Sequence, residues 1–116
     1  MLILVTGGAA SGKSEHAERL VCEKAQSRLY LATMQPFGKS AEARIARHRA
    51  LRAGKGFATV ERTLDLANLR LSQQYDGILL EDLGNLLANE LFAPEGAGAG
   101  SAFDSIVAGV DNLQKY

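Results

Sequence analysis

Cysteine is nearly absent from the sequence. Cys22 is the single cysteine among 116 residues, so the chain offers no pair for an internal disulfide. An unpaired cysteine suits the reducing cytoplasm, where thiols stay reduced. The sequence also lacks an apolar run of membrane-spanning length, and it opens on a predicted strand and not on a basic, apolar leader. We therefore expect a cytoplasmic protein without a membrane span, in which Cys22 is a small packed residue.

The chain also has no net charge, because 13 Lys and Arg residues balance 13 Asp and Glu residues. The balance hides a division: residues 1–62 hold eleven basic and five acidic residues, whereas residues 63–116 hold two and eight. Basic side chains are concentrated between Lys39 and Lys55, a density that can neutralise a polyphosphate. A nucleic-acid surface would need a strongly basic domain with interleaved aromatic residues, which this chain does not have. We expect no nucleic-acid partner.

Eight residues directly after the apolar run 2–6 match the phosphate-binding loop pattern G-x-x-x-x-G-K-[ST] at each defined position. They are Gly7, Gly8, Ala9, Ala10, Ser11, Gly12, Lys13 and Ser14. In such a loop the backbone N–H groups and a helix N-terminus bind phosphate oxygens, and Gly7 and Gly12 allow turns that a Cβ would obstruct. Lys13 can reach the β- and γ-phosphates, and the Ser14 hydroxyl can ligate the Mg²⁺ that accompanies a triphosphate. The motif predicts a nucleotide site but names no reaction, and a glycine-rich turn that matches by chance is the alternative.

The rest of the chain alternates between strand and helix patterns. The apolar periodicity and turn residues predict strands over 2–6, 29–33, 58–61 and 77–81, and helices over 13–26, 40–53, 64–71, 85–92 and 101–115, with loops at 34–38 and 93–100. Thr63 is expected to cap the helix over 64–71. This order predicts an α/β fold of the phosphate-loop NTPase (RecA-like) type, with a mainly parallel sheet and helices on both faces. At 116 residues the chain is expected to form a single nucleotide-binding domain.

Two acidic residues end the most apolar strand. Because the carboxyl ends of parallel strands converge on the ligand, Glu81 is the first candidate and Asp82 the second for the acid that directs Mg²⁺. Glu61, also at the end of a predicted strand, is a weaker candidate. The alternative is that these acids form an ordinary solvated strand end.

His48 lies in the basic segment. On a helix, Arg44 and Arg52 would flank its imidazole one turn away on either side, an environment that favours the neutral ring. A neutral imidazole near a bound triphosphate is a possible nucleophile toward phosphorus. The alternative is a solvated surface histidine.

Several segments resemble, in the same order, the bifunctional adenosylcobinamide kinase/adenosylcobinamide-phosphate guanylyltransferase family of cobalamin biosynthesis. The similar segments cover most of residues 2–92: Ile3 to Ser14 with Glu15-His16-Ala17-Glu18, then Tyr30-Leu31-Ala32-Thr33, Arg44-Ile45-Ala46-Arg47-His48-Arg49, Thr59-Val60-Glu61, Ile78 to Leu83, and Asn85-Leu86-Leu87. Segments that match in this order are much more specific than a phosphate-binding loop alone.

The resemblance implies two reactions. The enzyme would phosphorylate a hydroxyl of adenosylcobinamide with ATP or GTP, and then transfer GMP from GTP onto that phosphate through a guanylyl-histidine. It implies that His48 is the guanylylated residue, and that the nucleotide also contacts Ala32, Thr33, Met34, Arg49, Ala50, Leu51, Arg52, Glu61 and Glu81.

The resemblance further implies a homotrimer. It indicates that family members continue past the position of Tyr116, so this chain is expected to lack their C-terminal part. Two rival functions stay open: a small-metabolite or nucleotide kinase that needs Lys13 and Ser14 but not His48, and a nucleotide-binding module without turnover.

Overall fold

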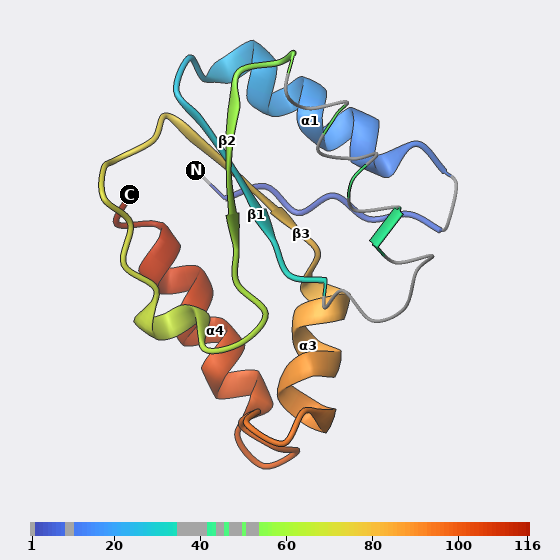
Figure 1. Cartoon of the computed structure of the whole chain (residues 1–116), viewed down its shortest axis with the longest axis vertical. Helices are drawn as coiled ribbons and strands as arrows, with labels where there is room; N and C mark the ends of the chain where they lie inside the picture. The colour runs from blue at the N-terminus through green and yellow to red at the C-terminus, as the bar shows by residue number, and fades with distance from the viewer. Residues whose placement is uncertain (1, 9–10, 35–41, 44–45, 47–49, 51–53) are drawn as a thin grey trace.

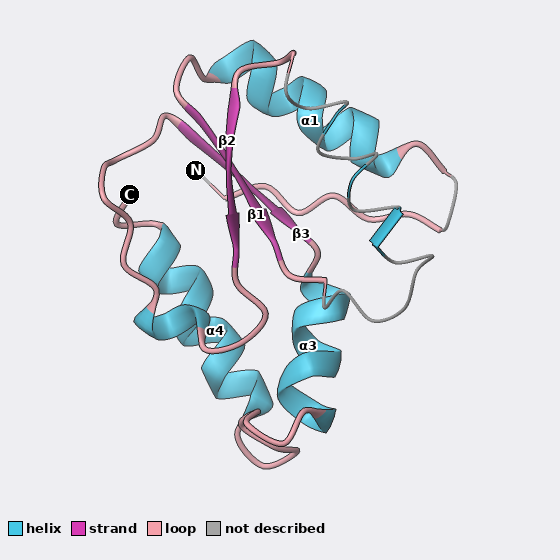
Figure 2. Cartoon of the chain, viewed as in Figure 1, coloured by secondary structure: helices cyan, strands magenta, loops and turns pink. Residues whose placement is uncertain are grey.

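The computed structural model describes residues 2–8, 11–34, 42–43, 46, 50 and 54–116. Figure 1 labels its elements, and Figure 2 distinguishes helices from strands. In chain order they are α1 (Lys13–Lys24), β1 (Arg28–Ala32), β2 (Phe57–Glu61), the 3₁₀ turn η1 (Leu66–Asn68), β3 (Gly77–Glu81), α3 (Leu83–Phe92) and α4 (Ala102–Leu113). The helix predicted over 40–53 lies largely outside the described residues.

The three strands form one parallel sheet in the order β2-β1-β3. The strands predicted over 29–33, 58–61 and 77–81 are therefore confirmed, each within one residue at its ends. Strand β1 is central and pairs along both of its edges, which explains why Leu29, Tyr30 and Leu31 are all buried. The predicted parallel α/β architecture is correct.

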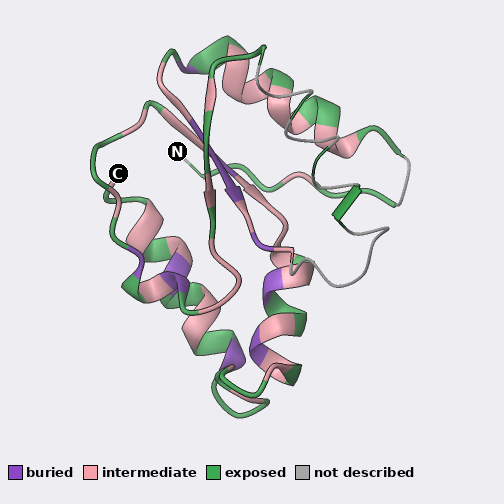
Figure 3. Ribbon diagram, in the orientation of Figure 1, coloured by how far each residue is buried: buried purple, intermediate pink, exposed green. Residues whose placement is uncertain are grey.

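Helices cover both faces of this sheet, as predicted. On one face, the Cα of Gly77 lies so close to α1 that an added Cβ would come within 2.9 Å of Cγ1 of Val21. On the other face, Leu31 packs with Leu66 and Leu86 in the core beneath η1, α3 and α4. Figure 3 shows buried positions along β1 and on α3 and α4. In the part of the chain that the structure describes, no helix is long and apolar enough to cross a bilayer.

A short polar bracket joins β1 and β3 at their amino ends. The Asp76 carboxylate accepts hydrogen bonds from the N–H groups of Gln26 (3.2 Å) and Ser27 (3.1 Å), and the Asp76 N–H donates to the Ser27 hydroxyl at 2.7 Å. The backbone N–H of Ser27, followed by that of Gln26, lowers the pKa of Asp76 below its ordinary value. The bracket holds the start of β3 beside the start of β1.

The strand predicted over 2–6 is wrong. Residues 2–8 are described without regular secondary structure, and Leu2 and Leu4 are 66% and 71% exposed. The apolar run has strand composition, but a strand also needs a neighbour for its N–H and C=O groups. In the described chain β3 pairs with β1 and not with residues 2–6.

The helix predicted over 64–71 is also wrong, since only the three residues of η1 form a helical turn. Asp65 has φ 56° in the left-handed region, and its carboxylate accepts from the Asn68 side-chain amide at 2.8 Å. The Asp65 N–H donates to the Glu90 carboxylate at 3.1 Å, so Thr63 does not cap a helix here. Local side-chain bonds of this kind compete with regular helix formation.

Glu90 is buried and connects three segments. Its carboxylate accepts hydrogen bonds from the N–H of Asp65 (3.1 Å), the N–H of Ala97 (3.0 Å) and the hydroxyl of Ser105 (3.1 Å). The structure confirms the helices predicted over 85–92 and 101–115, which are α3 and α4, and the loop predicted over 93–100 between them. Helix α3 begins two residues earlier than predicted. Glu90 therefore fixes that loop and α4 against η1.

Two helical glycines give a matched test of this packing. An added Cβ at Gly109 in α4 would lie 2.6 Å from the Cβ of Leu66, whereas at Gly84 in α3 the nearest atom, an Asp82 oxygen, is 3.5 Å away. We expect Gly109→Ala to lower the free energy of unfolding by about 1–3 kcal/mol through overpacking. Gly84→Ala should raise it by about 0.5–1 kcal/mol, because alanine favours the helix. Urea denaturation followed by circular dichroism measures both, and equal stability of the two variants would contradict the packing described here.

Candidate functional site

The carboxyl end of the sheet aligns three of the predicted site residues. Ala32 at the end of β1 lies opposite Glu61 on β2 and opposite Glu81 on β3. Residues that face each other across parallel strands project to the same side, and this row shares its side with Gly77, which packs on α1. The two glutamates are therefore separated at the backbone by two strand spacings, roughly 10 Å.

The phosphate-binding loop meets this row at Glu81. The Ser14 hydroxyl, in the first turn of α1, donates a hydrogen bond to Oε1 of Glu81. The Tyr30 hydroxyl donates to Oε2 of the same carboxylate. The sequence predicts that Ser14 and Glu81 each act on the same Mg²⁺ ion. The structure shows in addition that the two side chains are hydrogen-bonded directly to each other.

In the described part of the loop, Gly12 has the backbone conformation that a glycine at this position predicts. Gly12 has φ 82°, the left-handed region that glycine adopts without strain, and it directly precedes the first residue of α1. A Cβ at Gly7 would lie 2.6 Å from the Ser11 hydroxyl oxygen. The Lys13 ammonium donates to the Gly7 carbonyl at 3.0 Å in an exposed hydrogen bond, while the residue as a whole is half-buried. Gly8 is exposed, while Ala9 and Ala10 lie outside the described residues.

Thr33 is fully buried and holds the residue after β3 in place. Its hydroxyl donates to the Asp82 carbonyl at 2.8 Å and accepts from the Asp82 N–H at 2.9 Å, and its own N–H donates to the Glu81 carbonyl at 3.1 Å. The side-chain amide of Asn89, on α3, donates to the carbonyls of Thr33 (2.8 Å) and Thr63 (2.9 Å). We call this group of bonds the carboxyl-end clasp. It ties the ends of all three strands to α3.

Asp82, the second candidate for the acid that directs Mg²⁺, has a structural role at the start of α3. Its side chain accepts from the Asn85 N–H at 2.6 Å and caps the helix. Of the two neighbouring acids, Glu81 is thus the one directed at Ser14.

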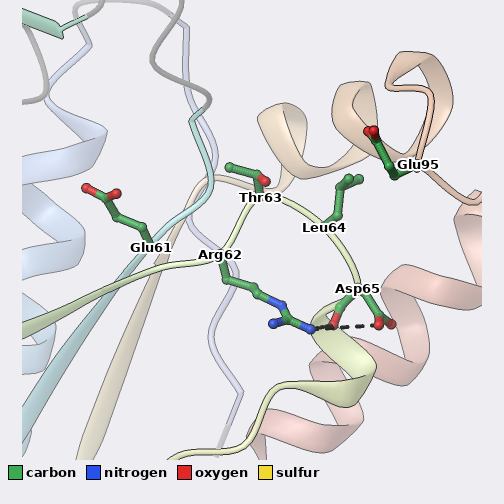
Figure 4. Close-up of a pocket in the computed structure, with 6 residues that line it drawn as sticks. All are labelled: Glu61, Arg62, Thr63, Leu64, Asp65 and Glu95. Atoms are coloured by element: carbon green, nitrogen blue, oxygen red, sulfur yellow. Dashed lines mark hydrogen bonds and ion pairs between the residues drawn. The ribbon is translucent and has the colours of Figure 1, made fainter.

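An open cleft of about 580 Å³ lies beside the end of β2, lined by Glu61, Arg62, Thr63, Leu64, Asp65 and Glu95. Figure 4 shows the Arg62 guanidinium directed at Asp65, while the Glu61 side chain extends the other way from the strand. The cleft shares Glu61 with the row of site residues, but Ser14 and Glu81 do not line it.

Several predicted site residues are not placed by the structure. His48, Arg49, Leu51 and Arg52 lie outside the described residues. Ala50 is exposed, and Met34 is half-buried just past β1. In the described chain no cluster of three or more His, Cys, Asp or Glu side chains could hold a metal ion.

Sequence reasoning missed Tyr30 and Asn89. The sequence does carry a signal for Tyr30. Tyr30 lies two residues before Ala32, so both side chains project from the same face of the sheet. This places Tyr30 diagonally opposite Glu81, at the end of the neighbouring strand. Asn89 carried no such signal, because its role depends on where α3 ends up relative to β1 and β2.

Comparison with known proteins gives a consistent relationship. Residues 3–115 match the model of the cobinamide kinase / cobinamide phosphate guanyltransferase family. The chain is 43% identical over 94 residues to the bifunctional adenosylcobalamin biosynthesis protein CobU of Escherichia coli. The aligned region covers 79% of this chain and 51% of that protein. It is 43% identical over 95 residues to CobU of Salmonella typhimurium, covering 80% of this chain and 51% of the relative.

A third relative, the bifunctional adenosylcobalamin biosynthesis protein CobP of Pseudomonas aeruginosa, is 42% identical over 80 residues, covering 68% of this chain and 46% of its own length. The chain thus spans about half the length of the curated relatives it matches. No solved structure matches it significantly.

The carboxyl-end clasp predicts a specific effect of the Thr33 hydroxyl. Thr33→Val keeps the shape of the side chain but leaves the part-buried N–H and C=O of Asp82 without the Thr33 hydroxyl. We expect the free energy of unfolding to fall by about 1–3 kcal/mol. Thr33→Ser, which retains the hydroxyl, should lose clearly less. Chemical denaturation measures the difference, and a valine variant as stable as the serine variant would show that these hydrogen bonds contribute little.

Proposed function

Since the chain belongs to the cobinamide kinase / cobinamide phosphate guanyltransferase family, we propose that it phosphorylates adenosylcobinamide and then transfers GMP onto the new phosphate. The observation that carries the proposal is the contact between Ser14 of the phosphate-binding loop and Glu81 at the end of β3. It joins the two residue types that phosphoryl-transfer enzymes of this kind use around a nucleotide. Because the chain spans about half of its relatives' length, the complete activity of those proteins is itself part of the proposal.

For the kinase reaction, residues 7–14 bind the triphosphate of ATP or GTP. Lys13 turns from the Gly7 carbonyl to the β- and γ-phosphates, an exchange that the exposed position of this hydrogen bond permits. The acceptor hydroxyl oxygen attacks the γ-phosphorus, the bond to the β-phosphate oxygen breaks, and the nucleoside diphosphate leaves as the hydroxyl proton is released.

The site suits Mg²⁺ as the nucleotide's companion. Hydroxyl and carboxylate oxygens are the ligands that Mg²⁺ prefers, and it is ordinarily held by one or two such groups together with phosphates and water. Ser14 and Glu81 fit this role. The ion would neutralise charge on the phosphates.

For the second reaction, an imidazole nitrogen of His48 attacks the α-phosphorus of GTP and pyrophosphate leaves. A phosphate oxygen of the adenosylcobinamide phosphate then attacks the guanylyl phosphorus and frees the imidazole. The family resemblance and the surrounding arginines support this role. We assign the nucleotide contacts to Ala32, Thr33, Met34, Glu61 and residues 49–52. A cytoplasmic homo-oligomer, a trimer by family resemblance, completes the proposal.

The phosphate-binding assignment is tested by removing the loop's cation. Lys13→Ala should weaken binding of GTP and ATP by about 10- to 100-fold, because the phosphates lose a charged hydrogen-bond donor. Lys24→Ala, at the last turn of the same helix, is the matched control and should bind as the parent chain does. Equilibrium binding of a fluorescent GTP analogue measures both. Parental affinity in Lys13→Ala would remove the assignment.

The guanylyl-histidine is tested by covalent labelling. Incubation with α-labelled GTP and Mg²⁺ should leave label on the denatured chain, while γ-labelled GTP should leave none. A phosphoramidate on imidazole is labile in acid and stable in base, which separates it from a serine ester. His48→Asn should lose the label and still bind nucleotide, since residues 7–14 are unchanged.

The only other histidine, His16, supplies the matched control, and His16→Asn should label normally. Label that persists in His48→Asn would assign the nucleophile to another residue. Nucleotide binding without any label would favour the plain kinase or the binding module, and release of ADP in the presence of candidate acceptors separates those two.

A further inference from the structure

Tyr30 places a buried phenol against the site. The residue is 5% exposed, and its hydroxyl donates to Oε2 of Glu81, the oxygen that Ser14 does not use. Both oxygens of this carboxylate therefore have a named hydroxyl partner. Neither the loop motif nor the acidic strand end assigns a function to Tyr30.

The pairing of the strands explains why this contact forms. Tyr30 lies opposite Leu79 on β3, two residues before Glu81, so Tyr30 and Glu81 are diagonal neighbours on one face. Diagonal pairs in a sheet are within reach of aromatic side chains. Phe57 packs on the tyrosine ring edge-on, with ring centroids 6.4 Å apart and an interplanar angle of 90°. The strand register sets where the ring lies, and Phe57 holds its orientation.

We propose that Tyr30 is a positioning residue, which holds Oε2 of Glu81 so that Oε1 is presented to Ser14 and to the magnesium ion of a bound nucleotide. This inference rests on the proposed nucleotide site. A carboxylate at the end of a flexible side chain would otherwise sample several rotamers and lose entropy when the ion binds. A fixed donor on Oε2 removes that loss in advance. Oε1, which accepts from Ser14, keeps a second lone pair for the ion.

A purely structural hydroxyl would behave differently. A buried phenol needs a hydrogen-bond partner, and loss of that bond alone would lower stability without altering the response to Mg²⁺. The positioning role instead predicts a specific change in metal dependence. The two interpretations are separated by measuring stability and Mg²⁺ dependence on the same variant.

The test is Tyr30→Phe, which removes the hydroxyl and keeps the ring on Phe57. Binding of a fluorescent GTP analogue is followed at equilibrium while MgCl₂ is titrated. We expect the Mg²⁺ concentration for half-maximal binding to rise about five- to tenfold, less than the full loss of one charged hydrogen bond because Tyr30 acts on the ion only through Glu81. Binding in EDTA should be unchanged. Tyr75→Phe, which removes a hydroxyl beyond the opposite end of β3, is the matched control and should leave the titration unchanged.

A double-variant cycle shows whether Tyr30 acts through Glu81. Glu81→Gln should itself raise the half-maximal Mg²⁺ concentration, and adding Tyr30→Phe to it should cause little further change. Phe57→Leu gives a second test, which keeps the Tyr30 hydroxyl. The Tyr30 ring loses its edge-on contact with Phe57, and the Mg²⁺ midpoint should rise by about twofold.

The outcomes separate the two proposals. An unchanged Mg²⁺ midpoint in Tyr30→Phe, alongside a raised midpoint in Glu81→Gln, overturns the role of Tyr30 and leaves the nucleotide site intact. The role of Tyr30 is also overturned if Tyr30→Phe raises the Mg²⁺ midpoint by the same factor in the parent chain and in Glu81→Gln. The Tyr30 hydroxyl would then act through a group other than Glu81. Nucleotide binding that is independent of Mg²⁺ in the parent chain, or unaffected by Glu81→Gln, overturns the proposed metal site and this inference with it.

Discussion

The central strand β1 is paired in parallel on both of its edges, and the two registers decide which side chains meet. Because Ala32 aligns with Glu61 on one side and Glu81 on the other, both glutamates project from the carboxyl end of the sheet on the face that α1 covers. The same registers place Tyr30 one diagonal step from Glu81. A shift of β3 by one residue would turn its side chains to the opposite face and separate Glu81 from Ser14.

Polar side chains reinforce these registers at both ends of the sheet. The Asp76 and Ser27 bracket joins the amino ends of β1 and β3, and the carboxyl-end clasp of Thr33 and Asn89 joins the ends of all three strands to α3. The hydrogen bonds of the bracket are exposed, whereas those of the clasp are part-buried. Hydrogen bonds shielded from water add modest net free energy when made, but cost more when one partner is removed. They therefore favour one arrangement of the site over near alternatives.

The two incorrect secondary-structure predictions share a cause. Residues 2–6 have the composition of a buried strand, and residues 64–71 have the apolar spacing of a helix. Composition and spacing report which residues tend to be buried, whereas a strand exists only beside a neighbour, and a helix only if its N–H groups have no better acceptor. At Asp65 the left-handed backbone, with φ 56°, interrupts a right-handed helix, and its N–H donates to the buried carboxylate of Glu90, 25 residues away in the chain.

The sequence by itself determined the phosphate-binding loop, the parallel α/β class and the strand that ends in Glu81, because these depend on local residue types and on spacing along the chain. It also identified the family through ordered segments that include His48. Only the tertiary structure decided that Glu81 and not Asp82 meets Ser14, that Thr33 and Asn89 form a clasp, and that Tyr30 joins the site. The physical reason is that hydrogen-bond partners 49 to 67 residues apart are set by sheet register and helix packing, which no local pattern encodes.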